Sequence, residues 1–109
     1  MTTIMIHKTE NGEYRGFTCM GHSGFAGKGK DIVCASISVL VINTINSMEE
    51  LAAEDMGITT NEETGFIDCR FRSGPSEKGK LLMDSMILGL SDIAKQYGRK
   101  YLVLKFEEV

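Results

Sequence analysis

The segment from residue 31 to about residue 54 limits the fold of this chain most strongly, because its first three turns are apolar nearly all round. A helix of this kind must be buried, with a sheet on one side and a further layer or a second subunit on the other. Many of its residues are β-branched, so burial rather than intrinsic helix propensity has to stabilise it. With 109 residues, of which 42% are hydrophobic, the chain suits one domain, residues 1–109, around one core.

Short or alternating apolar segments predict strands before and after this helix. Asn11-Gly12 predicts a turn that joins the first two strands in an antiparallel hairpin. The expected elements are strands at residues 3–8, 14–20, 56–61, 65–72 and 101–106, the helix from residue 31, and a second helix that ends near residue 97. The order β-β-α-β-β-α-β predicts an α+β fold, a single compact layered domain whose apolar first helix packs on a mixed or antiparallel sheet.

The second helix has clear boundary signals. Pro75 suits its first turn, and Gly98 is a natural stop after its last. A stripe at helical spacing is expected to face the core: Leu82, Met86, Leu90 and Ile93. Three alternating side chains of the last strand are expected to point inward: Leu102, Leu104 and Phe106.

Charge, hydropathy and cysteine content narrow the classes of function. The net charge of −3 argues against direct nucleic-acid binding. The longest apolar stretch, residues 32–42, is interrupted by Ser36 and Ser38 and predicts no membrane span. The N-terminal residues show no secretory signal, so we expect a cytoplasmic protein. The three cysteines are an odd number without short pairing, which indicates a reducing compartment, and no metal-ligand spacing is present, so we expect no metal and no cofactor.

Residues 21–34 carry the chemistry that the sequence predicts. They form a glycine-rich, charged segment that leads into the apolar helix, with His22 near its start and Cys34 just inside the helix. Asp31 suits the helix N-cap, which places Cys34 at the third helical position, where the helix N-terminus favours a thiolate. His22 is then positioned to take the thiol proton and return it to a leaving amine. Backbone N–H groups at the beginning of the helix are positioned to hold the oxyanion. We expect the loop to open and close through its glycines: Gly21, Gly24, Gly27 and Gly29.

Two other interpretations of this segment stay open. A buried free cysteine and a lone loop histidine are common and need no catalytic role. Residues 24–30 also match half of a phosphate-binding loop, G-x-x-x-x-G-K. The next residue there should be Ser or Thr, but it is Asp31, whose charge repels a phosphate. The chain also lacks the alternating strand–helix order of a parallel nucleotide-binding sheet.

Further residues have supporting or structural assignments. Asp31 either only caps the helix or also orients His22, and its position favours the cap. Ser38 lies one turn after Cys34 on the same helix face, where it either supports the site or bonds back to a helix carbonyl. The residues expected to play no part in the chemistry are the inert core cysteines Cys19 and Cys69, the structural or exposed His7, and the solvated Lys28 and Lys30.

The string between Gly21 and Leu40 carries a specific resemblance. It reads G-H-S-G-F-A-G-x-G-x-D-I-V-C-A-S-I-S-V-L and resembles the signature of the ribosomal-processing cysteine protease family, known as Prp. Chain length, element order and motif position match as well, so the resemblance covers essentially the whole chain. It implies that His22 and Cys34 are the catalytic dyad of a cysteine endopeptidase.

The resemblance also implies a substrate and an assembly. Members of the family remove a short N-terminal extension from large-subunit ribosomal protein number twenty-seven, cutting beside a pair of aromatic residues. They are homodimers with a compact α/β sandwich fold. A ribosomal protein precursor is therefore the expected partner. Two other hypotheses remain: a non-catalytic ribosome-assembly module that binds the same extension, and a redox-sensing thiol protein, for which the sequence offers no obvious resolving cysteine.

Overall fold

The order of helices and strands agrees with the sequence prediction. The computed structural model describes residues 1–21 and 28–109, without the side chains of residues 28–31. Its elements, in chain order, are β1 (Thr2–Lys8), β2 (Tyr14–Met20), α1 (Lys28–Glu50), β3 (Met56–Asn61), β4 (Phe66–Phe71), α2 (Glu77–Tyr97) and β5 (Leu102–Glu108). The α+β class and the β-β-α-β-β-α-β order are thus confirmed.

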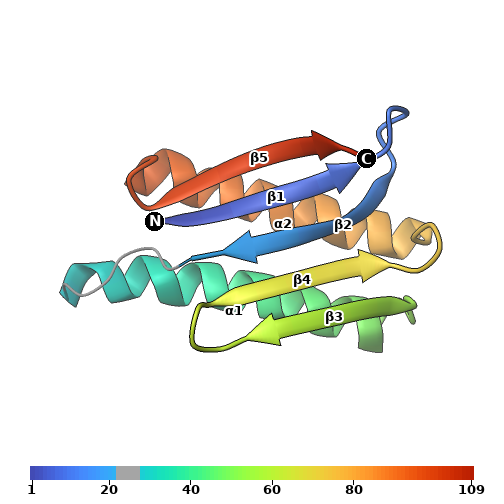
Figure 1. Cartoon of the computed structure of the whole chain (residues 1–109), viewed down its shortest axis with the longest axis horizontal. Coiled ribbons are helices and arrows are strands. Elements are labelled where there is room, and N and C mark those ends of the chain that lie inside the picture. The colour runs from blue at the N-terminus through green and yellow to red at the C-terminus, as the bar shows by residue number, and fades with distance from the viewer. Residues whose placement is uncertain (22–27) are drawn as a thin grey trace.

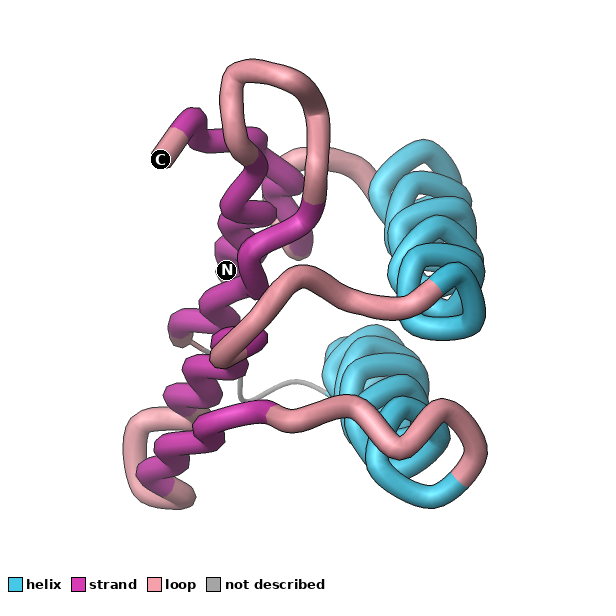
Figure 2. The backbone as a smooth tube through the Cα atoms, turned by 90° about the vertical axis from the view of Figure 1, so that its right-hand side faces the viewer, coloured by secondary structure: helices cyan, strands magenta, loops and turns pink. Residues whose placement is uncertain are grey.

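The five strands form one mixed sheet in the order β3-β4-β2-β1-β5. β1 is parallel to β5, and the other neighbouring pairs are antiparallel, including the predicted β1–β2 hairpin. Figure 1 shows the sheet in front of both helices, and Figure 2 shows it edge-on with α1 and α2 side by side against one face. The described residues therefore form two layers, and none of their helices covers the other face of the sheet.

The core lies between the sheet and the helices. Strand side chains alternate between the two faces, so Ile4 and Ile6 of β1 meet their β2 partners Cys19 and Phe17 on the inner face, where all four are buried. The predicted stripe of α2 is confirmed as part of the core, with two buried members and two that pack half-buried against it: Met86, Leu90, Leu82 and Ile93.

α1 differs from the prediction at both ends. It begins at Lys28, three residues before Asp31, and ends at Glu50 rather than near Glu54. Asp31 therefore lies in the first turn and is not the N-cap. The helix ends early because the chain turns toward β3 at Ala53, whose φ of 51° lies in the left-handed region.

α1 is also less enclosed than its composition predicts. Its inner face packs on the sheet, but Ile32, Val39 and Ile42 are 61%, 68% and 48% exposed. By length and composition alone, the segment Ile32–Glu50 could cross a membrane, and it is the one such helix in the described part of the chain. The sequence predicted no segment that could span a membrane, because the apolar stretch of residues 32–42 is interrupted. A helix that lines a protein core passes the same test, and α1 has such a buried inner face.

α2 begins later than expected. Ser76 is its N-cap, because the Ser76 hydroxyl accepts a hydrogen bond from the Gly79 N–H at 3.3 Å. Pro75 therefore precedes the helix instead of lying in its first turn. The Ser76 N–H and hydroxyl both donate to the Glu54 carboxylate, which links this helix start to the loop after α1. Gly98 ends α2 as predicted.

Phe106 is the inward position that the structure leaves open. It pairs with Ile6 and so shares the inner face of the sheet, but its side chain is 55% exposed. The ring lies near the end of β5, which is an edge strand. Part of its surface is covered by the amine of Lys8, 5.3 Å from the ring centre. Leu102 is buried and Leu104 packs half-buried against the core, as expected.

Candidate active site

Cys34 is the most accessible of the three thiols. It lies on α1 and is half-buried, whereas Cys19 on β2 and Cys69 on β4 are buried, and all three are free. Cys19 and Cys69 thus lie in the core, as the sequence predicts. Of the three thiols, Cys34 is therefore the one that is partly exposed at the surface.

The start of α1 is farther from Cys34 than expected. Because the helix begins at Lys28, Cys34 is its seventh residue rather than its third. The electrostatic effect of a helix end falls off within the first turn, where the unpaired N–H groups also lie. The geometry therefore does not support the prediction that the helix start stabilises the Cys34 thiolate.

The predicted loop residues fall into two groups. His22, Gly24 and Gly27 lie outside the described residues. Gly21 has a φ of 81°, and a β-carbon there would lie 2.7 Å from the Met1 carbonyl oxygen, so this position requires glycine. Gly29, with the two lysines on either side of it, belongs to α1 and not to a loop, which corrects its assignment as a flexible loop residue.

Cys19 lies close enough to Cys34 for their charges to interact. Burial, followed by the negative charge of Cys34, raises the pKa of Cys19 to about 11. Cys19 is the next-to-last residue of β2 and comes three residues before His22 in the chain. The end of β2 that precedes the predicted histidine is therefore near the predicted nucleophile.

One flank of α1 extends from Cys34 along the helix. Residues three or four apart lie on one helix face, so Ser38 follows Cys34 by one turn, and Ile42 and Ile45 follow Ser38. Ser38 is exposed. Among the described residues, no three His, Cys, Asp or Glu side chains come together in a way that could hold a metal ion.

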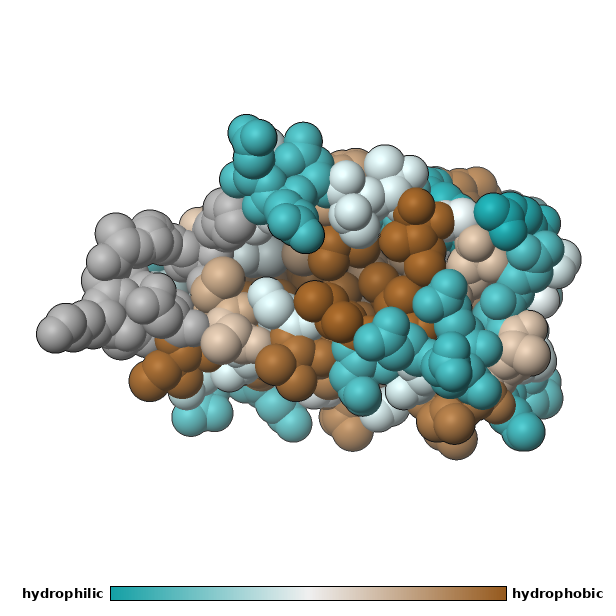
Figure 3. Space-filling view, turned by 90° about the horizontal axis from the view of Figure 1, so that it is seen from below, coloured by the Kyte–Doolittle hydropathy of each residue, from teal (hydrophilic) through white to brown (hydrophobic). Residues whose placement is uncertain are grey.

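This flank leads into an apolar pocket of about 280 Å³ between α1 and the β3–β4 hairpin. In Figure 3, hydrophobic side chains gather in a hollow between the sheet and the helix layer, with hydrophilic residues around it. The sequence did not predict this pocket, because α1 and the β3–β4 hairpin become neighbours only through the order of the strands in the sheet. Its principal apolar residues are Ile42, Ile45, Ile58, Phe66 and Ile67.

Comparison with known proteins identifies the family. The family model for cysteine protease Prp matches residues 1–102. The chain belongs to the cysteine protease Prp family. Its members are cysteine proteases, so the predicted enzyme class is confirmed.

Individual Prp proteins agree with this assignment. The chain is 27% identical over 101 residues to the ribosomal processing cysteine protease Prp of Bacillus subtilis (strain 168), with 89% of this chain and 90% of the relative covered. The Staphylococcus aureus (strain Mu50) protein of the same name is 25% identical over 97 residues, with 89% and 92% covered.

Solved structures confirm the fold. The Prp protease from S. aureus in complex with a covalently linked product peptide superposes with a TM-score of 0.89 at 23% identity, covering 98% of this chain and 100% of that one. A Streptococcus mutans protein superposes with a TM-score of 0.85 at 26% identity, covering 100% and 96%.

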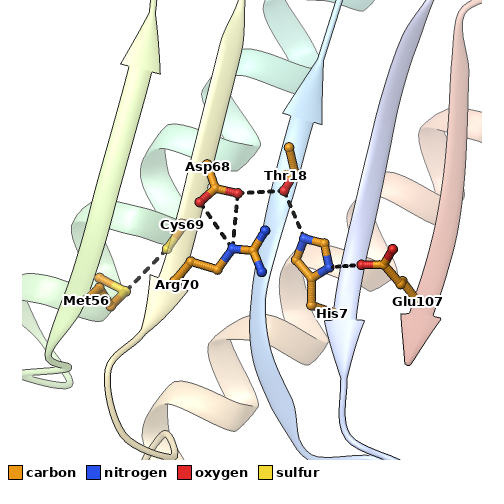
Figure 4. Close-up of polar contacts among 7 residues, drawn as sticks. All are labelled: His7, Thr18, Met56, Asp68, Cys69, Arg70 and Glu107. Atoms are coloured by element: carbon orange, nitrogen blue, oxygen red, sulfur yellow. Dashed lines mark hydrogen bonds and ion pairs between the residues drawn. The ribbon is translucent and has the colours of Figure 1, made fainter. Parts of the chain in front are cut away.

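This Prp-family chain also has a polar cluster on the helix-free face of the sheet (Figure 4). His7 Nδ1 lies 2.7 Å from Glu107 Oε1, and Nε2 lies 2.8 Å from Thr18 Oγ1. The Thr18 hydroxyl donates to Asp68, which also accepts from Arg70. The cluster thus connects β5, β1, β2 and β4.

The charge of Asp68 depends on these neighbours. Burial acts to raise its pKa, but hydrogen bonds from Arg70 and Thr18 and the charges of Arg70 and His7 together hold the pKa below its ordinary value. His7 is buried and hydrogen-bonded within this cluster, which agrees with the structural alternative of the prediction and not with the exposed one. The cluster lies on the sheet face opposite α1, so it is not part of the site around Cys34.

Proposed function

We propose that this protease removes the N-terminal extension of large-subunit ribosomal protein number twenty-seven, cutting beside a pair of aromatic residues. The curated relatives are named for ribosomal processing, and they match the chain over 89% of its length. The observation that carries the assignment of the site is the half-buried thiol of Cys34 on α1, in a Prp-family chain whose other thiols are enclosed in the core.

In this proposal Cys34 is the nucleophile and His22 the general base and acid. The Cys34 sulfur attacks the scissile carbonyl carbon while His22 accepts the thiol proton. His22 gives this proton to the amine nitrogen as the C–N bond breaks, and the acyl group stays on Cys34 as a thioester. A water molecule that loses its proton to His22 then hydrolyses the thioester and restores the thiol. Each proton that leaves the sulfur or the water thus has a defined acceptor.

Asp31 and Ser38 are proposed as supporting residues. Asp31 lies three residues before Cys34 and Ser38 four residues after it, so both positions share a helix face with the thiol. Because Asp31 lies in the first turn of α1 and not at its N-cap, the proposal that it orients His22 no longer competes with a capping role. Ser38 is exposed, and its proposed role is to donate a hydrogen bond near the reacting atoms.

We further propose that the enzyme works as a cytoplasmic homodimer. Ile32 and Val39 lie seven residues apart on α1, and Leu81 and Leu88 lie seven residues apart on α2, so each pair occupies one face of its helix. All four side chains are more than half exposed. Exposed apolar surface on two neighbouring helices is typical of a contact with another protein chain.

Cleavage of a peptide that carries the aromatic pair tests the proposed activity. Wild type is expected to cut beside the pair, and Cys34→Ala to cut at less than about a thousandth of that rate while still binding the peptide. His22→Ala is expected to lose about 100-fold or more. Asn46→Ala, an exposed change on the same helix, is the matched control and should keep full activity.

Two results contradict the proposal. Unimpaired cleavage by Cys34→Ala removes Cys34 as the nucleophile. Tight binding of the peptide by wild type without any turnover supports the non-catalytic assembly module instead.

A further inference from the structure

The apolar pocket beside the β3–β4 hairpin, about 280 Å³ in volume, is a feature of the α1 surface that catalysis itself does not use. Its walls come from α1 and from both strands of the hairpin, with a polar rim that includes Asn61 and Glu62. Two of its apolar side chains, Ile42 and Ile58, are 48% and 36% exposed. The pocket is therefore open to the surface and lined by side chains that gain from being covered.

The pocket lies on the same side of α1 as Cys34. At about 100° per residue, Cys34, Ser38, Ile42 and Ile45 fall within a sector of about 80° on the helix surface. The hollow between α1 and α2 lies farther round the helix toward α2, because its lining includes Leu40 of α1 together with Gly89 and Ile93 of α2. Among the described residues, the pocket beside the hairpin includes Ile42 and Ile45 and so continues the surface that starts at Cys34.

A second connection passes through the sheet. Ile67, which lines the pocket, pairs with Cys19 across the β2–β4 register. Cys19 in turn lies within electrostatic range of Cys34. The floor of the pocket and the surroundings of the nucleophile are thus joined through neighbouring core residues.

The distance along α1 defines which part of a bound peptide can reach the pocket. Ile42 follows Cys34 by eight residues, which is about 12 Å at the helical rise per residue. An extended peptide advances about 3.3 Å per residue, so the pocket lies three to four residues from the scissile bond. The aromatic residues directly beside the cut are too close to Cys34 to fill it from a peptide that follows α1.

We propose that this pocket is a specificity subsite that binds one large apolar side chain of the substrate, three to four residues from the scissile bond. The proposal rests on the proposed peptidase function and adds a recognition position to it. The apolar walls favour an aliphatic or aromatic side chain. Asn61 and Glu62 on the rim leave the peptide backbone beside polar groups, so that its N–H groups need not be buried without partners.

Methyl NMR of the Cys34→Ala protein tests the subsite without any turnover. The probe is a peptide that keeps the aromatic pair at the cut and carries a third phenylalanine, moved one residue at a time from the second to the sixth residue from the scissile bond. Ring-current shifts of the Ile42 and Ile58 methyl groups should be largest when the added ring is three or four residues away. The methyl groups of Ile32 and Ile93, on the other flank, should not shift.

Filling the pocket tests the same subsite by cleavage. Ile58→Trp places a large side chain in the pocket, whereas Thr59→Trp adds the same side chain on the opposite face of the same strand. For the peptide with the added phenylalanine at the third or fourth residue, Ile58→Trp is expected to lower kcat/KM about 10-fold or more, and Thr59→Trp less than about 2-fold. For a peptide with alanine there, the two variants should be equal.

The outcomes separate the subsite from the enzyme assignment. Methyl shifts away from the pocket, no shift at any phenylalanine position, or equal losses in the two tryptophan variants overturn the subsite while leaving proteolysis intact. Loss of cleavage by wild type, or cleavage by Cys34→Ala, overturns the peptidase proposal, and the NMR result still decides whether the pocket binds the side chain.

Discussion

The three cysteines have the same side chain in different surroundings, and the surroundings decide which one reacts. Burial raises the pKa of Cys19 to about 11, helped by the charge of Cys34, and burial together with nearby carboxylates raises the pKa of Cys69 to about 12. Both thiols therefore stay protonated at neutral pH and are shielded from reagents. Cys34 is half-buried at the surface of α1.

Alkylation should distinguish the three thiols. We expect iodoacetamide at about pH 8 to modify Cys34 at least about 10-fold faster than Cys19 or Cys69, because a thiol reacts as an accessible thiolate. Peptide mapping by mass spectrometry measures the three rates in one reaction. In Cys34→Ser the fast phase should disappear, and equal rates at all three cysteines in folded wild type would contradict the prediction.

The buried thiols also predict how stability depends on pH. In the unfolded chain the pKa of each thiol lies near its ordinary value of 9.0, well below the values of about 11 and about 12 in the folded protein. Above pH 9 the folded state therefore holds more protons than the unfolded state. The stabilisation is complete below pH 9 and is lost as the pH rises, by up to about 1.4 kcal/mol per pH unit for each thiol.

Urea unfolding at about pH 8, 9 and 10 measures this dependence. Cys69→Ala removes one of the two titrating groups, so its free energy of unfolding should fall less steeply over this range than that of wild type. A variant slope equal to the wild-type slope would show that Cys69 titrates alike in both states.

At the scale of elements, the start of α2 depends on a contact that is remote in sequence. Ser76 caps the helix by accepting from Gly79, and its own N–H and hydroxyl donate to Glu54, 22 residues earlier. A β-carbon on Gly79 would lie 2.1 Å from the Glu54 carboxylate, so this carboxylate packs directly over the first turn. The early end of α1 puts Glu54 in the loop that makes this contact.

Removal of the Ser76 cap should destabilise the fold. We expect Ser76→Ala to lower the free energy of unfolding by about 1 kcal/mol, because the Gly79 N–H loses its acceptor and Glu54 loses a donor. Chemical denaturation with a common slope for both proteins measures the difference. The matched control is Ser85→Ala, an exposed position within α2, where alanine is favoured and no loss is expected.

At the scale of the whole molecule, the sheet order places the apolar pocket and leaves one helix surface uncovered. β3 is an edge strand, so the β3–β4 hairpin lies at the border of the sheet beside α1. Figure 2 shows the sheet on one side of the two helices and no further layer of described residues on their other side. The outer faces of α1 and α2 carry exposed apolar side chains, which these two layers do not bury. A second copy of the chain is the cover that we propose for them.

Sedimentation equilibrium tests this assembly. Wild type is expected at twice the chain mass of 12.0 kDa. Leu81→Glu combined with Leu88→Glu places two charges on the outer face of α2 and should shift the equilibrium toward the monomer. A wild-type mass of one chain at all concentrations, or an unchanged dimer in the double variant, would count against this surface.

Much of the fold follows from local patterns. The alternation of apolar residues located the strands, and Gly98 located the end of α2, because these signals act within a few residues. The predicted first helical residue of α1, the one after Asp31, was four residues too late, since Asp31 suits a cap but the glycine and lysines before it also accept helical backbone. Phe106 was assigned to the correct face of its strand, but its exposure depends on what covers that face.

The sequence by itself therefore determined the order of elements, their inner faces and the family motif that includes Cys34, because hydrophobic periodicity and turn signals are local properties of the chain. Only the tertiary structure decided that β1 pairs with β5, that Glu54 supports the start of α2, and that Ile42 and Ile58 share a pocket. These contacts join residues far apart in sequence, and their free energy depends on the strand order, which periodicity does not encode.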